Sequence, residues 1–135
     1  MKYFVLAELT DSAVARRLHI DNTPTPQVTE NLIALVENIL DPARELMGCP
    51  VRVNSGYRCE LLNRCVGGVP DSQHLQGQAA DVTTTSLSEN KRLFEVLLSL
   101  PFDQLIWERG NEHGPAWIHV SFCKDGDNRK EVLRL

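Results

Sequence analysis

The sequence predicts an α+β protein with a small, mostly antiparallel sheet and flanking helices. Apolar residues recur at helical spacing in the first third of the chain, and they alternate with polar residues in several short segments further on. One long helical stretch separates these segments. No internal repeat, low-complexity tract or Gly/Ser-rich linker divides the chain of 135 residues, so we expect a single domain over residues 1–135.

The strongest helical pattern begins after a proline-rich turn. Thr25 is a suitable N-cap, and Pro26 suits the first helical position. The apolar residues that follow at three- and four-residue spacing are Val28, Leu32, Leu35, Val36, Ile39 and Leu40. Pro42 predicts a kink or a break before residues 43–47, and Gly48 predicts the end of the helix.

The middle of the chain alternates between strand and helix signals. Residues 51–54 alternate like a strand, and the segment Ser55-Gly56-Tyr57-Arg58 breaks this pattern with a turn. Residues 60–66 suit a short helix. Residues 79–83 read as a strand of small apolar residues that contains one acid, Asp81.

The last helix and the remaining strands follow. Ser86 with Glu89 three residues later is a capping-box signature for a helix over residues 87–100, which Pro101 stops. Two alternating strands are expected next, joined by a polar loop, and a short final strand closes one edge of the sheet. Their expected ranges are 103–108, 116–122 and 131–135.

Composition and charge exclude several classes of function. The formal net charge of −4 at pH 7 argues against a nucleic-acid partner, because such proteins need a concentrated basic face. No stretch approaches the roughly 18 apolar residues of a membrane span. Charged residues such as Glu8 and Asp11 interrupt the start of the chain, so we expect synthesis in the cytoplasm without a signal peptide.

The four cysteines are too few for a disulfide-stapled scaffold in a chain of this length, and none forms a C-x-x-C pair. We interpret them as buried free thiols. The interval from Cys59 to Cys65 leaves one alternative open, a pair of thiols brought together on a short helix.

Three residues form a candidate metal site. His74 and Asp81 flank a glycine turn, and His119 lies on a predicted strand whose alternate residues Ile118 and Val120 face inward. Two imidazoles and one carboxylate are good zinc ligands that leave a fourth position open, as in catalytic sites. The residues alone leave alternatives open: a His74–Asp81 hydrogen bond that fixes a turn, and an ordinary core or surface role for His119.

The motifs resemble a known family. Ser-x-His-x-x-Gly-x-Ala-x-Asp over residues 72–81, followed by Trp-x-His-Val over 117–120, is similar to the zinc signature of the D-alanyl-D-alanine carboxypeptidases. These metallopeptidases share the hedgehog-type zinc fold with murein endopeptidases and phage endolysins. The turn at residues 55–58 matches their Ser-Gly-(aromatic)-Arg element. The resemblance covers nearly the whole chain and is to a compact single-domain subgroup of phages and bacteria.

The resemblance implies roles for individual residues. His74, Asp81 and His119 match the ligands of one zinc ion. Arg58 matches the arginine that holds the substrate carboxylate or polarises the scissile carbonyl, and its alternative is a surface ion pair with Asp71 or Glu60. The residues assigned to substrate binding are Arg58, Ser72, Gln73 and Trp117.

The catalytic base departs from the family pattern. Several relatives place an acid three residues before the last zinc histidine, and Ala116 stands there in this chain. Glu108, at the end of the neighbouring predicted strand, is the first candidate, with a solvated acid as its alternative. His113 in the polar loop is the second candidate and Glu112 the third.

The resemblance implies a zinc peptidase that cleaves peptidoglycan stem peptides, as a D-Ala-D-Ala carboxypeptidase or an endolysin-like endopeptidase. It implies action at the cell wall or in the periplasm, by a monomer. Because Ala116 cannot accept a proton, a non-catalytic zinc module that binds the cell wall or a partner is the alternative. A structural protein of a virion or phage tail that uses this fold to bind the wall is a third.

Overall fold

The computed structural model describes residues 1–135 and contains a five-stranded sheet with the strand order β1-β2-β4-β3-β5. The strands are β1 (Arg52–Ser55), β2 (Ala79–Thr83), β3 (Gln104–Glu108), β4 (Trp117–Ser121) and β5 (Glu131–Arg134). The first three neighbouring pairs in this order are antiparallel, and β5 runs parallel to β3. The predicted α+β class with a mostly antiparallel sheet is therefore confirmed.

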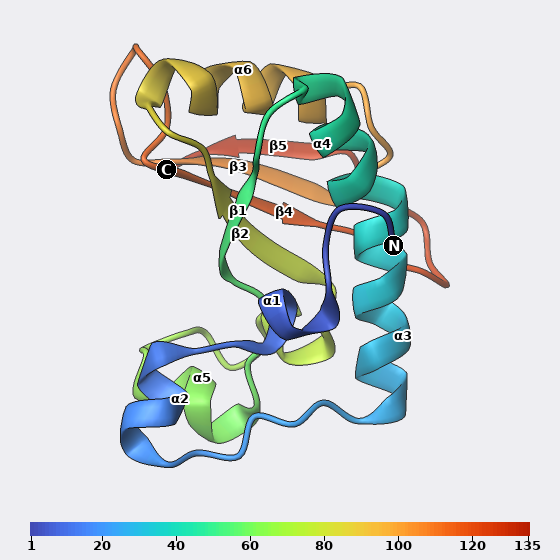
Figure 1. Ribbon diagram of the computed structural model, residues 1–135, viewed down its shortest axis with the longest axis vertical. Helices are drawn as coiled ribbons and strands as arrows, with labels where there is room; N and C mark the ends of the chain where they lie inside the picture. The colour runs from blue at the N-terminus through green and yellow to red at the C-terminus, as the bar shows by residue number, and fades with distance from the viewer.

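Helices surround the sheet, and none of them is long and apolar enough to cross a membrane. Figure 1 shows α4 and α6 along one side of the sheet, with α2 and α5 at the opposite end of the molecule. The helical elements are α1 (Leu6–Thr10), α2 (Ala13–Leu18), α3 (Pro26–Leu35), the π-helical η1 (Val36–Leu40), α4 (Asp41–Met47), α5 (Glu60–Cys65), the 3₁₀ turn η2 (Gln73–Gln76) and α6 (Leu87–Leu97).

The two faces of the sheet have different chemistry because side chains alternate along each strand. Ala80 and Val82 of β2 and Ile118 and Val120 of β4 belong to a cluster of 20 buried residues that also includes side chains from α3, η1, α4 and α6. The alternate residues of the same strands point to the opposite face, where the polar side chains collect. The sheet thus separates the core from the candidate site.

The long N-terminal helix begins as predicted. Thr25 caps α3 by accepting a hydrogen bond from the amide of Val28 at 3.2 Å, and Pro26 occupies the first turn. The break expected near Pro42 takes the form of the π turn η1, after which α4 continues to Gly48. Proline has no N–H to donate to the preceding turn, and its ring crowds that turn, so a locally widened helix is the physical consequence.

Several local expectations differ from the structure. The sequence patterns did not predict α1 and α2, which are too short for a clear helical period. Helix α6 ends at Leu97 instead of Leu100, because residues 98–100 turn toward Pro101. The prediction of buried thiols is wrong: all four cysteines are free, but Cys65 is exposed and the other three are only half-buried. Cys59 instead caps α5 through its sulfur.

An ion pair between a buried carboxylate and an exposed arginine fastens the C-terminal segment to the sheet. Asp103 is 2 % exposed and accepts hydrogen bonds from the Nε and Nη2 atoms of Arg129 at 3.0 and 2.8 Å. These bonds hold the pKa of Asp103 at about 2, below its ordinary 3.8, although burial acts in the opposite direction. The charged form of Asp103 is therefore favoured in the folded state.

This pair predicts an acid-dependent loss of stability. Because the folded-state pKa is depressed, the contribution of Asp103 is fully present above about pH 4 and is lost as the pH falls toward 2. We expect about 1–2 kcal/mol, since solvent reaches the Arg129 guanidinium and screens part of the interaction. Urea unfolding from pH 5 to pH 2 measures it. Asp103→Asn should flatten the pH dependence in this window; parallel curves for the two proteins would contradict the assignment.

Candidate metal centre

The loop that carries His74 is fixed by short-range hydrogen bonds. Ser72 accepts from the amide of His74 at 3.2 Å and so caps η2, and Gly77 ends the turn with a φ of +71°. The imidazole of His74 is buried, and its Nδ1 lies 2.7 Å from the carbonyl oxygen of Gly56. Since a carbonyl can only accept, Nδ1 carries the hydrogen, and the lone pair is left on Nε2.

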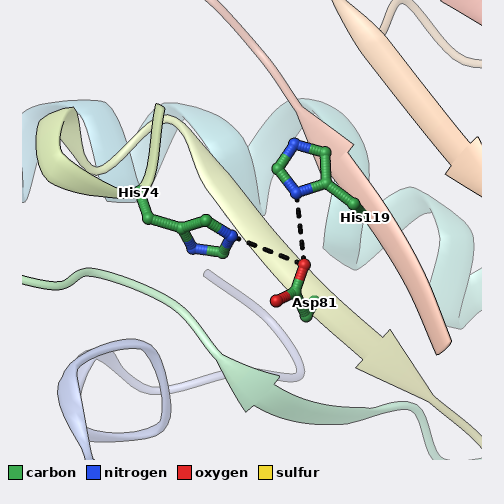
Figure 2. Close-up of side chains that lie close together, drawn as sticks. All are labelled: His74, Asp81 and His119. Atoms are coloured by element: carbon green, nitrogen blue, oxygen red, sulfur yellow. Dashed lines mark hydrogen bonds and ion pairs between the residues drawn. The ribbon is translucent and has the colours of Figure 1, made fainter. Parts of the chain in front are cut away.

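The other two residues meet because of the strand register. Asp81 of β2 lies directly opposite His119 of β4, so their side chains project side by side from the face of the sheet away from the core. His119 Nδ1 is 3.2 Å from Asp81 Oδ1, and His74 Nε2 is 3.4 Å from the same oxygen. Figure 2 shows both imidazoles directed at this carboxylate from separate elements.

These three side chains could hold a metal ion. Their candidate ligand atoms all lie within 4.8 Å of one another, close enough for one small cation to contact all three after small side-chain shifts. Two imidazole nitrogens and one carboxylate oxygen suit zinc and leave a coordination position for water or substrate. The arrangement therefore has the composition of a catalytic metal centre rather than of a closed structural one.

The carboxylate at the centre of this group is ionised. Burial opposes the charge on Asp81, but the hydrogen bond from His119 and the closeness of both imidazoles outweigh burial and hold its pKa well below the ordinary range. Asp81 is therefore an anion at any working pH. An anionic oxygen between two imidazoles is the state that a cation requires of its ligands.

The group opens into a cleft of about 830 Å³. Three further residues on its walls come from the same face of the sheet: Ile106 and Glu108 of β3 and Trp117 of β4. Arg58, from the turn after β1, forms another part of the wall. The cleft thus brings a cation, an acid and an apolar surface to the three candidate ligands.

Arg58 is held beside the site without an ionic partner. Its Nη2 lies 3.5 Å from Ser72 Oγ, and its buried Nε has no hydrogen-bond partner. Burial lowers the pKa of Arg58, and the nearby Asp81 opposes this shift. Neither of the alternative ion pairs, with Asp71 or Glu60, is present, and Glu60 lies 3.9 Å from Arg64 instead. Arg58 therefore keeps donors available to a bound molecule.

The three candidate bases occupy different positions. Glu108 lines the cleft and is half-buried; burial and the charge of Asp81 raise its pKa, while His119 and Arg109 act in the opposite direction. The side chains of His113 and Glu112 are 74 % and 82 % exposed, lie 3.6 Å apart, and do not line the cleft. Only Glu108 of the three shares the cleft with the candidate ligands.

The residues assigned to substrate binding also lie at the cleft. Trp117 is half-buried opposite Glu108, and Ser72 and Gln73 line the wall beside His74. The side-chain amide of Gln73 is already bonded to Asp103 at 2.9 Å. The structure thus brings Arg58, Ser72, Gln73 and Trp117 together around the ligand group.

Sequence reasoning missed several residues of the site. The carbonyl of Gly56 orients His74, and backbone carbonyls carry no signal in a sequence. Ile106 lies opposite His119 on the cleft face, although it reads as a core residue. Arg109 lines the cleft in the left-handed conformation, with a φ of 54°. The acid–amide bond between Asp103 and Gln73 joins segments 30 residues apart.

Two imidazoles and one carboxylate at the wall of an open cleft are a donor set that metal-dependent hydrolases use. Comparison with protein families agrees with this class. The model of the family described as Peptidase M15 matches residues 2–121, so the chain belongs to the peptidase M15 family of metallopeptidases. No curated protein matches the chain.

We expect substitution of Gly77, which ends the turn that carries His74, to destabilise the protein more than substitution of Gly48. Gly77 has a φ of +71°, and a Cβ there would lie 2.7 Å from the carbonyl oxygen of Val28. Gly48 has a φ of +69° with no atom within 4 Å of that position. Gly77→Ala should therefore lower the free energy of unfolding by about 2–4 kcal/mol, and Gly48→Ala by about 1–2 kcal/mol.

Urea unfolding of both variants beside the wild type measures this difference. Gly48→Ala is the matched control, because it has the same backbone strain without the close approach to α3. Equal losses in the two variants would show that packing against α3 does not constrain the His74 turn.

Proposed function

We propose that this protein is a zinc-dependent peptidase that cleaves peptidoglycan stem peptides, as a D-alanyl-D-alanine carboxypeptidase or as an endolysin-like endopeptidase. The observation that carries the proposal is the meeting of His74, Asp81 and His119 in a cleft that also holds Arg58 and Glu108. Membership in the peptidase M15 family supports the reaction class, and the resemblance to the carboxypeptidases supports the substrate class.

The three ligand candidates fit zinc in chemistry as well as in spacing. The bond from His74 Nδ1 to Gly56 leaves Nε2 free to coordinate, and Asp81 is ionised. His119 completes the set from β4. Bound at this group, zinc would supply a Lewis acid that polarises the scissile carbonyl and acidifies water.

Glu108 is the proposed general base. Ala116, which stands where several relatives carry an acid, donates its amide to the carbonyl of Glu108 at 2.9 Å, so the residue just before β4 lies beside the end of β3. An acid on β3 can therefore replace one lost from the segment before β4. The raised pKa of Glu108 favours a group that takes a proton from the attacking water and returns it to the leaving amine.

Arg58 is the proposed anion-binding residue. Its guanidinium is half-buried on the cleft wall, has no acidic partner and retains an unpaired Nε–H. A planar fork of donors suits a peptide carboxylate or the oxygen that gains charge as the carbonyl is attacked. Trp117, opposite Glu108, offers an aromatic surface for the aliphatic parts of the peptide.

A non-catalytic zinc module remains the second candidate, because Ala116 cannot act as an acid. Digestion of purified peptidoglycan followed by mass spectrometry of the muropeptides distinguishes the two functions. We expect shortened or separated stem peptides that disappear when a chelator is added. If zinc-loaded protein binds cell walls but releases no product from any peptidoglycan type, the binding module is the better account.

The ligand assignment predicts the metal content. Purified protein should contain about one zinc per chain, and His74→Ala or His119→Ala should lose it. Elemental analysis measures the ratio. Zinc should also raise the melting temperature of the wild type by mass action, and not that of the two variants. His113→Ala, which changes an exposed imidazole outside the cleft, should keep its zinc; full zinc occupancy in His119→Ala would contradict the assignment.

The assignment of the base predicts a kinetic difference. Glu108→Gln keeps the size of the side chain but removes the proton acceptor, so zinc should stay bound while kcat falls roughly 10²–10⁴-fold with little change in KM. Steady-state hydrolysis of a stem peptide measures both constants. His113→Ala should cost much less. Near-normal turnover in Glu108→Gln together with an inactive His113→Ala would move the role to the loop histidine.

A further inference from the structure

A buried carboxylate outside the ligand group connects three segments that meet at the site. Asp103 lies just before β3, its side chain is 3 % exposed, and it does not line the cleft. Besides the two Arg129 side-chain bonds, it accepts from the Arg129 amide at 3.0 Å and from Gln73 Nε2 at 2.9 Å. Both carboxylate oxygens are therefore fully used in holding other residues.

The backbone of Asp103 is hydrogen-bonded to both β4 and β5. The amide of Asp103 donates to the carbonyl of Ser121, two residues beyond His119, at 2.8 Å. Its carbonyl accepts from the amide of Glu131, at the start of β5, at 2.9 Å. Asp103 thus fixes the end of the strand that carries one candidate ligand.

The bond to Gln73 connects Asp103 to the loop that carries the other imidazole, His74. Gln73 directly precedes His74, and its carbonyl accepts from the amide of Gln78 at 3.1 Å, across the turn. The Arg129 bonds alone would satisfy the buried charge of Asp103. The additional bond to Gln73 is the one contact that ties this charge to the His74 loop.

We propose that Asp103 is a positioning residue for the metal centre, which acts on the His74 loop through the side-chain amide of Gln73. This inference rests on the proposed zinc site and adds to it a residue that touches neither metal nor substrate. Removing a partner that orients a metal ligand typically weakens binding by 10- to 100-fold. A carboxylate that served only to anchor Arg129 would instead change stability and leave zinc affinity unchanged.

A double-mutant cycle tests this role. Gln73→Leu removes the side-chain amide and leaves the Asp103–Arg129 pair intact. Asp103→Asn replaces one carboxylate oxygen with an NH₂ group, which cannot accept hydrogen bonds from the donors of Arg129 and Gln73 that face it. Zinc affinity is measured by competition with a chromophoric chelator. Each variant should bind zinc roughly 10–100-fold more weakly, and the double variant should be no weaker than the weaker single one, because both changes break the same connection.

Asp41→Asn is the matched control. Asp41 accepts from the backbone amides of Lys2 and Tyr3 at 2.6 and 2.9 Å and does not line the cleft. The control variant should lose stability to urea without a change in zinc affinity. Unchanged zinc affinity in both Gln73→Leu and Asp103→Asn, or losses that simply add in the double variant, would overturn the proposal.

Amide hydrogen exchange in the metal-free protein separates this inference from the proposed zinc site. The Gln78 amide should exchange faster in Gln73→Leu and in Asp103→Asn than in the wild type, and not in Asp41→Asn. If the wild type binds no zinc, the proposed function fails, and the exchange rates alone decide the positioning role. Unchanged exchange at Gln78 in both variants would then overturn it.

Discussion

The register between β2 and β4 is the constraint on which the site depends. It places Asp81 opposite His119, and the same alternation directs Ala80, Val82 and their partners on β4 into the core. A slip of one residue would bury the carboxylate among apolar side chains and move the core residues to the cleft. The hydrophobic core therefore fixes the geometry of the two candidate ligands on these strands.

The third candidate ligand depends on a different kind of support. His74 lies on a short turn rather than on a strand. Its position rests on the hydrogen bonds that it donates to Ser72 and to the Gly56 carbonyl, on the Gln73–Asp103 contact, and on the close packing of Gly77 against α3. Two candidate ligands are held by sheet pairing and one by a polar network. Preorganised imidazoles and an ionised carboxylate reduce the cost of ordering that metal binding would otherwise carry.

Local sequence signals predicted the sheet class and the α3 cap at Thr25. They indicated His74, Asp81 and His119 only as a candidate group, and the family resemblance supplied the ligand set. The signals work where alternation or capping chemistry is local, as around His119. They fail where contacts between distant segments decide the structure, as in the bond from His74 to the Gly56 carbonyl and the bond from Gln73 to Asp103. They also miss the two short helices before residue 20. Asp103 read as the first residue of a predicted strand, so the sequence carried no signal for that network.

The most direct test of this account is X-ray absorption spectroscopy of the zinc-loaded protein at the zinc edge. A centre built from His74, Asp81 and His119 predicts a shell of nitrogen and oxygen ligands near 2.0–2.1 Å, with the outer-shell scattering of about two imidazoles. His119→Ala should lose one imidazole from that signal. A sulfur ligand near 2.3 Å, or a shell without imidazole, would show that zinc binds elsewhere and would contradict the account.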